Sequence, residues 1–262
     1  MRIYSWNING IRAAAKKGFG EWLAESESFL VGVQEVRALR EQMSDEIAEP
    51  EGWHSRFVAA ERKGYSGVGA FSAQAPDEHV AQLGMDKYDI EGRYQLLRIG
   101  KLQVANVYFP NGNGKDRDNS RVPYKLGFYK RVYNTLNKNK LAGDRILVMG
   151  DFNTAHEAID LARPKSNKKT SGFLQEERDE ISRWIRGGWV DTFRHFHADE
   201  PDHYSWWSQR MGARQRNVGW RIDYIMASPG AIPFVKGAHI HPQTMGSDHC
   251  PISVDLDPAI LE

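Results

Sequence analysis

Acidic and amide side chains stand where apolar runs of this sequence begin or end. Asn7, Glu35 and Asp151 each close or follow such a run, and Asp223 opens another. An Asp or Asn at a strand end is most often a turn or cap residue, so one such position is weak evidence. Several in one chain favour a shared site, because ligands commonly bind at the strand ends of an α/β sheet.

The sharpest motif is GDFN at 150–153, which presents Asp151 and Asn153 at i and i+2 after an apolar run. A carboxylate general base and a neutral hydrogen-bond donor can then face one phosphate. A strand that ends in Asp is also typical of nucleotide triphosphatases. The sequence has no G-x-x-x-x-G-K-[ST] motif, however, and GNGKD at 112–116 lacks its spacing and hydroxyl, so we reject that interpretation.

A second motif, GSDHCP at 246–251, places Asp248 and His249 side by side at the predicted start of a strand. Adjacent strand residues point to opposite faces, so the two should serve different partners. His249 could bind a scissile phosphate while a distant Asp fixes its tautomer. Asp223 is the candidate, because an Asp within an apolar strand needs a partner.

Hard oxygen ligands are offered by Glu35, Asp248 and Asn7, and they suit Mg²⁺, which takes few protein carboxylates and keeps water. His239 and His241 share a strand face at i and i+2 and form a candidate zinc pair. We favour surface or packing roles for them, because no third ligand is near in the sequence.

Two segments concentrate positive charge, and aromatic residues lie in or beside the second. RPKSNKK occupies 163–169, and RMGARQRNVGWR at 210–221 follows YSWW at 204–207. The formal net charge is only +1, so any nucleic-acid contact must come from such local patches. Charge runs usually face solvent, but cations can hold phosphates while aromatic faces receive an unstacked sugar or base.

The elements that position these residues are read from hydrophobic patterning. Near-continuous apolar runs predict strands covered on both faces, at 2–7, 29–34, 67–72, 94–99, 102–109, 146–151, 223–228 and 251–256. Helices are predicted at 18–26, 122–141 and 174–187. An α/β fold with helices outside sheets follows.

Composition is that of an ordinary folded protein, with 262 residues, 40% hydrophobic and 26% charged. No linker or repeat divides the chain, which predicts one domain over 1–262. No apolar run approaches the roughly 18–20 residues that span a bilayer, and no signal-peptide pattern opens the chain, which predicts a cytoplasmic protein with no membrane partner. The single cysteine, Cys250, permits no internal disulfide.

The chain strongly resembles the exonuclease III family of AP endonucleases, within the endonuclease/exonuclease/phosphatase superfamily. The motifs that carry the resemblance run from end to end: SWNINGIRA (5–13), QE (34–35), KGYSGVG (63–69), EGR (91–93), VYFPNG (107–112), GDFNTAHEAIDL (150–161), NKKTSGFLQEER (167–178), VDTFRH (190–195), YSWW (204–207), NVGWRIDY (217–224) and GSDHCPI (246–252). The resemblance implies a four-layer α/β sandwich, in which two β-sheets pack face to face with helices on the outside.

The resemblance also implies roles for single residues. Metal ligands are Asn7, Glu35 and Asp248, for Mg²⁺ or alternatively Mn²⁺. Catalytic residues are Asp151 at the attacking water, Asn153 and Tyr108 at phosphate oxygens, and the pair His249 and Asp223. Residues that bind DNA are Asn167, Lys168, Lys169, Arg210, Arg214, Trp206, Trp220 and Ile222, of which the last three are the expected walls of a pocket for a flipped-out abasic sugar.

Three positions depart from the family pattern. Val36 and Arg37 follow Glu35 where Thr-Lys is usual, which keeps the charge but loses a hydroxyl. Arg210 stands where some relatives place a Met that fills the gap in the DNA helix.

The expected function is hydrolysis of the backbone 5′ to abasic sites in double-stranded DNA by a monomer, leaving a 3′-hydroxyl. The expected side activities are a 3′→5′ exonuclease and 3′-end cleaning. One alternative is a superfamily phosphodiesterase on inositol phosphates or phospholipid, which would not predict tryptophans beside basic loops. Another is a DNA-binding module without catalysis, which would have lost catalytic residues, whereas every expected position is filled.

Overall fold

The computed structural model describes residues 1–116, 118–138 and 143–262. One six-stranded sheet has the order β13 (Val235–Ile240), β14 (Ile252–Leu256), β1 (Arg2–Asn7), β2 (Leu30–Gln34), β4 (Val68–Ser72) and β3 (His54–Val58). The other has the order β5 (Glu78–Val80), β6 (Tyr94–Ile99), β7 (Leu102–Tyr108), β8 (Arg145–Asp151), β12 (Asp223–Ala227) and β9 (Val190–Asp191). A short ribbon pairs β10 (Trp206–Trp207) with β11 (Gly219–Trp220).

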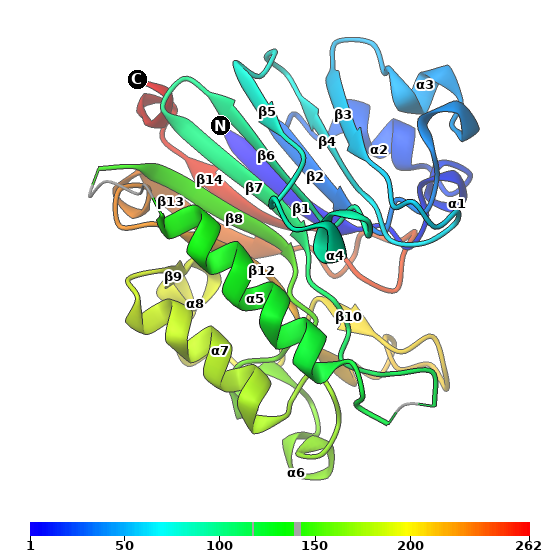
Figure 1. Ribbon diagram of the computed structural model, residues 1–262, viewed down its shortest axis with the longest axis vertical. Helices are drawn as coiled ribbons and strands as arrows, with labels where there is room; N and C mark the ends of the chain where they lie inside the picture. Colours follow the sequence, from blue (N-terminus) through cyan, green and yellow to red (C-terminus); the bar gives the residue numbers. More distant parts are fainter. Residues whose placement is uncertain (117, 139–142) are drawn as a thin grey trace.

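Helices cover the outer face of each sheet (Figure 1). Those beside the first sheet are α1 (Ile11–Ala15), α2 (Phe19–Glu25) and α3 (Asp45–Ala48); those beside the second include α5 (Val122–Asn137) and α7 (Gln175–Arg186). The remaining short helices are α4 (Asp86–Asp89), α6 (Pro164–Asn167) and α8 (Thr192–Phe196), with 3₁₀ turns at η1 (Arg40–Gln42), η2 (Ala158–Asp160), η3 (Ile232–Phe234) and η4 (Pro258–Leu261).

The alternation of side chains along each strand explains why the strand sequences are apolar throughout. In β8, Leu147 and Met149 enter the core between the sheets, whereas Ile146 and Val148 enter the core under α5 and α7. Successive side chains of a strand point to opposite faces, and here both faces are covered. The predicted four-layer α/β sandwich is confirmed.

Element boundaries differ from the predictions at a few places. The helix predicted at 122–141 ends at Asn137, and residues 139–141 lie outside the described part of the chain. Strands β3 and β13 were not predicted, because they are edge strands with exposed polar residues and so lack a continuous apolar run. Strand β14 pairs with β1, which joins the two chain ends in one sheet and supports one domain over 1–262, still a prediction.

A buried ion network anchors the segment that enters β12. The Arg221 guanidinium is buried and donates to Asp160 at 2.8 Å and to Asp191 at 2.8 and 3.2 Å. Arg194 donates to the same Asp160 oxygen at 2.6 Å. Burial opposes ionisation of Asp160, but the charges of Arg221 and Arg194 outweigh it and lower its pKa to about 2. The sequence groups Arg221 with the basic segment 210–221, whereas in the structure its side chain is buried.

This network predicts an acid-dependent part of the stability. Asp160→Asn should lower the free energy of unfolding at pH 7 by at least about 2 kcal/mol, because one unit of pKa shift is worth about 1.36 kcal/mol. A depressed carboxyl pKa stabilises the fold above the unfolded pKa of about 4, and this contribution is lost as the pH falls toward 2. Urea unfolding at several pH values measures it.

The matched control is Asp77→Asn, which removes an exposed partner of Arg98 and should cost less than about 1 kcal/mol. Equal losses in the two variants would show that the Arg221 network is not a special anchor.

Candidate active site

Strand register brings the polar residues at the ends of β7, β8 and β12 together. Asp151 lies opposite Tyr108 in the parallel pair β7–β8 and opposite Asp223 in the antiparallel pair β8–β12. His249 comes from the segment before β14 and forms a bridge with Trp206 of β10. Side chains far apart in the sequence therefore meet at one edge of the two sheets.

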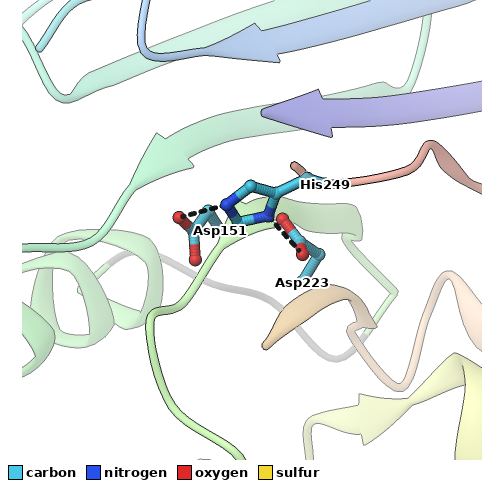
Figure 2. A group of neighbouring side chains, drawn as sticks. All are labelled: Asp151, Asp223 and His249. Atoms are coloured by element: carbon cyan, nitrogen blue, oxygen red, sulfur yellow. Dashed lines mark hydrogen bonds and ion pairs between the residues drawn. The ribbon is translucent and has the colours of Figure 1, made fainter. Parts of the chain in front are cut away.

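The His249 imidazole lies between two carboxylates (Figure 2). Its Nδ1 is 2.9 Å from Oδ2 of Asp223, and its Nε2 is 3.9 Å from Oδ2 of Asp151. We assign a hydrogen to Nδ1, because the facing carboxylate oxygen can only accept. Burial disfavours the charged ring, but the carboxylates of Asp223 and Asp151 outweigh it and raise the pKa of His249. The ring is therefore held as a cation.

Asp151 is buried and receives several hydrogen bonds. Its Oδ1 accepts from the Asn153 backbone N–H at 2.7 Å, and its Oδ2 accepts from the side-chain amides of Asn7 at 2.9 Å and Asn153 at 3.1 Å. Burial and the nearby charge of Asp223 raise the pKa of Asp151. A carboxylate with a raised pKa can accept a proton from water at near-neutral pH.

The chain turns sharply after β8 to present Asn153. Gly150 has a φ of 146°, and a Cβ there would lie 1.8 Å from the Val107 carbonyl oxygen, so only glycine fits. Asn153 has a φ of 50°, a left-handed conformation that Asn tolerates. Its Nδ2 also donates to the Phe109 carbonyl at 2.9 Å, and its Oδ1 accepts from Asn111 at 3.0 Å.

Glu35 and Tyr108 face each other from the ends of β2 and β7. The Tyr108 hydroxyl donates to Oε1 of Glu35, and Arg37 contacts Oε2 of Glu35 at 2.5 Å. Burial and the Glu35 charge raise the pKa of Tyr108 well above its ordinary value, so the phenol stays neutral and remains a hydrogen-bond donor.

Asp248 precedes His249 and accepts hydrogen bonds from two neutral donors. Its Oδ1 accepts from the Asn9 side chain at 2.8 Å, and its Oδ2 accepts from the Trp206 indole at 3.2 Å. Burial opposes the charge, but His249 and these donors outweigh it and lower the pKa of Asp248. Asp248 and the adjacent His249 do serve different partners.

A pocket of about 550 Å³ opens beside these residues. Its lining includes six residues from the predicted set, Asn153, Lys169, Arg210, Trp206, Trp220 and Ile222, together with Asn111, Asn113, Asn119, Thr170, Ser171, Gly172 and Ser208. The Trp206 and Trp220 rings are 6.3 Å apart and nearly perpendicular. Both are partly exposed, while Ile222 is buried, so the tryptophans form walls rather than core.

The other predicted DNA-binding residues are placed differently. Asn167 ends α6, where its side chain donates to the Arg163 carbonyl at 2.8 Å, and the exposed Lys168 follows it. Arg214 stacks over Trp207 and donates to the carbonyls of Ser247, Pro242 and Thr244. Its contacts secure the loop before Asp248, and they leave few donors for a phosphate.

The family of this chain follows from comparison with known proteins. The model of the endonuclease/exonuclease/phosphatase family matches residues 4–249, which is most of the chain. The chain belongs to this family. An exodeoxyribonuclease of Bacillus subtilis is 36% identical over 259 residues, covering 98% of this chain and 100% of that protein.

Further relatives of the same family agree. A Dictyostelium discoideum protein named DNA-(apurinic or apyrimidinic site) endonuclease is 34% identical over 258 residues, covering 98% of this chain and 71% of that protein. The structure of an AP endonuclease from Archaeoglobus fulgidus superposes with a TM-score of 0.88 at 27% identity, over 98% of this chain and 99% of that one. The predicted resemblance is confirmed.

This edge of the family's fold can hold a metal ion. Donor atoms of Asp151, Asp223 and His249 lie within 4.8 Å of one another, and Oδ1 of Asp223 is buried with no hydrogen-bond partner among the described residues. The Asp223 oxygen that faces His249 already accepts from that ring and from Ser205 at 2.6 Å, which favours an ion pair over a metal there.

Asn7, Glu35 and Asp248 form the second candidate metal site. Asn9 joins two of them, because its backbone N–H donates to Oδ1 of Asn7 and its side chain to Asp248, while the backbone N–H of Gly10 donates to the Glu35 carbonyl. Glu35 and Asp248 are part-exposed hard oxygen donors, so a cation here could keep water ligands.

Sequence reasoning missed three supporting residues of the site. Asn9 orients Asn7 and Asp248, Asn111 orients the Asn153 amide, and the buried Ser205 hydroxyl donates to Asp223. Each lies inside a motif that carries the family resemblance, but none has chemistry that would single it out. Their contacts become visible only when distant segments are placed together.

The geometry predicts the titration of His249. Asp223→Asn should lower the pKa of His249, because the neighbouring negative charge that favours the imidazolium is removed. Ser205→Ala is the matched control, because it removes a hydrogen bond to Asp223 but leaves the charge. An NMR titration of the histidine ring in metal-free protein measures both. Equal pKa values in the two variants would contradict the assigned pair.

Proposed function

We propose that this protein hydrolyses the DNA backbone 5′ to abasic sites and leaves a 3′-hydroxyl. The observation that carries the proposal is the position of the Asp151, His249 and Asp223 cluster beside a pocket walled by Trp206 and Trp220. The cluster supplies phosphodiester chemistry, and the pocket supplies a place for a sugar without a base. The names of the relatives from B. subtilis and D. discoideum agree with it.

The chemistry divides among residues of the chain. Water oxygen attacks phosphorus, its proton passes to Asp151, and the bond from phosphorus to the 3′ oxygen breaks as that oxygen takes a proton from solvent water. The cationic His249, held by Asp223 at 2.9 Å, offsets the charge that builds on the phosphate oxygens. Asn153 and Tyr108 are the proposed donors to the same phosphate, and each turns from its present acceptors, which are Phe109 and Asp151 for Asn153 and Glu35 for Tyr108. Fixed positions on strand ends keep Asp151, Asp223 and His249 oriented before the reaction begins.

A divalent cation, proposed as Mg²⁺ with Mn²⁺ as a substitute, would be held by Asn7, Glu35 and Asp248. When bound, it supplies electrostatic stabilisation of the phosphate and of the departing oxygen. The charge of His249 and the neutral donors Asn9 and Trp206 lower the pKa of Asp248 and so favour its ionised form, which suits a cation.

DNA is held by few charges in this proposal. Lys169 and Arg210 line the pocket, and Lys168 is exposed beside them, so these cations are proposed to contact phosphates. Arg214 supports the 242–247 loop, and its predicted phosphate contact becomes an indirect role. The proposed partner is double-stranded DNA, bound by a monomer. Among the described residues, every helix is too short or too polar to cross a membrane.

The test is incision of labelled duplexes that carry an abasic analogue, a recessed 3′ end or no lesion. With Mg²⁺, the parent should cut 5′ to the analogue, and excess EDTA should abolish cutting. Asp151→Asn and His249→Ala should each lower single-turnover rates by about 10²–10⁴-fold. Their combined loss should be less than the product, because both act on one phosphate.

The variant Lys130→Ala is the control. Lys130 lies on α5, and its exposed ammonium is 3.9 Å from Glu180 of α7. Hydrolysis of an inositol phosphate or a phospholipid, with intact DNA duplexes left uncut, would support the other phosphodiesterase function. Binding of DNA without any cutting would indicate a non-catalytic module.

The pocket itself predicts selectivity. Trp220→Ala should weaken discrimination between abasic and intact duplexes, because an abasic nucleotide flips at little cost and the walls formed by Trp206 and Trp220 leave less room for a base. The lost contact should be worth about 1–3 kcal/mol, if stacking is a guide. The measurement is the ratio of incision rates on the two duplexes.

Trp53→Ala serves as the control for removing a partly exposed indole, because it packs against the α1–α3 side of the fold. Circular dichroism confirms folding of both variants. Unchanged selectivity in a folded Trp220→Ala, and likewise in Trp206→Ala, would reject the pocket while leaving the phosphodiesterase chemistry intact.

A further inference from the structure

Both carboxylate oxygens of Glu35 are occupied by side chains of this chain. Oε1 accepts from the Tyr108 hydroxyl, and Oε2 contacts Nη2 of Arg37 at 2.5 Å. The two partners differ in character. Tyr108 is buried and neutral, whereas the Arg37 side chain is 44% exposed and carries a full charge.

The backbone holds Arg37 in this position. Glu35 and Arg37 both have left-handed conformations, with φ of 55° and 53°. The N–H groups of Val36 and Arg37 donate to the carbonyls of Gly67 at 3.1 Å and Ser66 at 2.7 Å. Such conformations are costly for non-glycine residues and persist where surrounding contacts fix them. The contact between Arg37 and Glu35 can therefore open through side-chain rotation alone.

Space for that rotation is present. A cavity of about 670 Å³ adjoins Arg37, and its lining includes Gly10, Val36, Met43 and Ile47. The ion pair is exposed mainly on its Arg37 side, because 44% of the Arg37 side chain but only 13% of the Glu35 side chain is exposed. Water screens the exposed guanidinium, so a stronger ligand for Glu35 can displace it.

We propose that the Arg37 guanidinium competes with the divalent cation for Oε2 of Glu35 and so weakens metal binding by the DNA-free enzyme. The inference rests on the metal site of the proposed function. One carboxylate oxygen cannot contact both cations at full strength, and a guanidinium left beside a bound dication would repel it. Arg37 thus sets the cation concentration at which the site fills.

The experiment is Mn²⁺ titration of DNA-free protein by isothermal titration calorimetry. Arg37→Ala should bind Mn²⁺ about twofold to tenfold more tightly than the parent, since a competing ion pair and a like charge are both removed. Arg37→Lys keeps the charge and should fall between them. Mn²⁺ should also raise the Tm of Arg37→Ala more than that of the parent at equal concentration.

Arg40→Ala is the matched control. Arg40 lies three positions further along the chain and pairs with Asp45 and Glu49 at the surface, so its removal deletes the same charge without freeing Glu35. Its affinity for Mn²⁺ should stay close to the parental value. Glu35→Gln should abolish the gain when combined with Arg37→Ala.

The inference is overturned if Arg37→Ala binds Mn²⁺ no more tightly than Arg40→Ala, or if none of the variants binds it measurably. The readout does not involve DNA, so the proposed function can fail separately. If the protein has no incision activity but Arg37→Ala binds Mn²⁺ more tightly than the parent, the competition is supported and the proposed substrate is wrong. If the enzyme incises DNA but its affinity for Mn²⁺ is the same in Arg37→Ala and the parent, the proposed function is supported and the competition is wrong.

Discussion

The whole site depends on placing two buried carboxylates opposite each other on neighbouring strands. The register of β8 and β12 pairs Asp151 with Asp223, and neither is solvated. Two negative charges so close in a dry environment are mutually unfavourable. The His249 ring between them relieves this, because one imidazolium can serve both carboxylates. The histidine must therefore arrive from the far end of the chain, which requires both sheets to be assembled.

A second buried ion pair supports the wall of the pocket. Lys125 of α5 and Glu177 of α7 are fully buried and 2.7 Å apart. The Lys125 ammonium also donates to the Asn153 carbonyl at 2.6 Å, and Glu177 accepts from the Gly172 N–H at 2.6 Å. Breaking a buried pair by removing one partner is strongly destabilising. The two outer helices thus fix the turn that carries Asn153 and the pocket wall at Gly172 together.

Local patterns made the strands and their polar ends predictable, because both sheets are covered on both faces and every buried strand reads as apolar. The residues at those ends, Asp151 and Asp223, could be singled out because a charge in such a run needs a partner. The layered arrangement was predicted from the family resemblance, since the sequence of one strand does not show which strands it pairs with or which sheet it joins. Edge strands such as β13 were not predicted, because only two of the six residues of β13 are buried and the strand has no continuous apolar run.

Arginines were the hardest residues to place from sequence. Arg221 meets Asp160, which is 61 positions away, and Arg214 meets carbonyls of a loop about 30 positions away. Nothing in the surrounding letters distinguishes such a residue from one that faces solvent. A guanidinium can occupy either place because it carries several donors in a planar fork. Only the tertiary fold decides which arginines remain free.

Because some arginines are engaged in internal contacts, fewer cations are available to bind the proposed DNA substrate. With a net charge of +1, and with Arg214 and Arg221 engaged inside the protein, the pocket rim presents few cations, chiefly Lys169 and Arg210. Phosphate contacts are independent of sequence and lesion, so they position a duplex without selecting it. In the proposed function, selectivity therefore has to come from the shape of the pocket between Trp206 and Trp220. Under that proposal, a nucleotide that has lost its base enters at little cost, and the carboxylate and imidazole groups act only on the phosphate that this entry delivers to them.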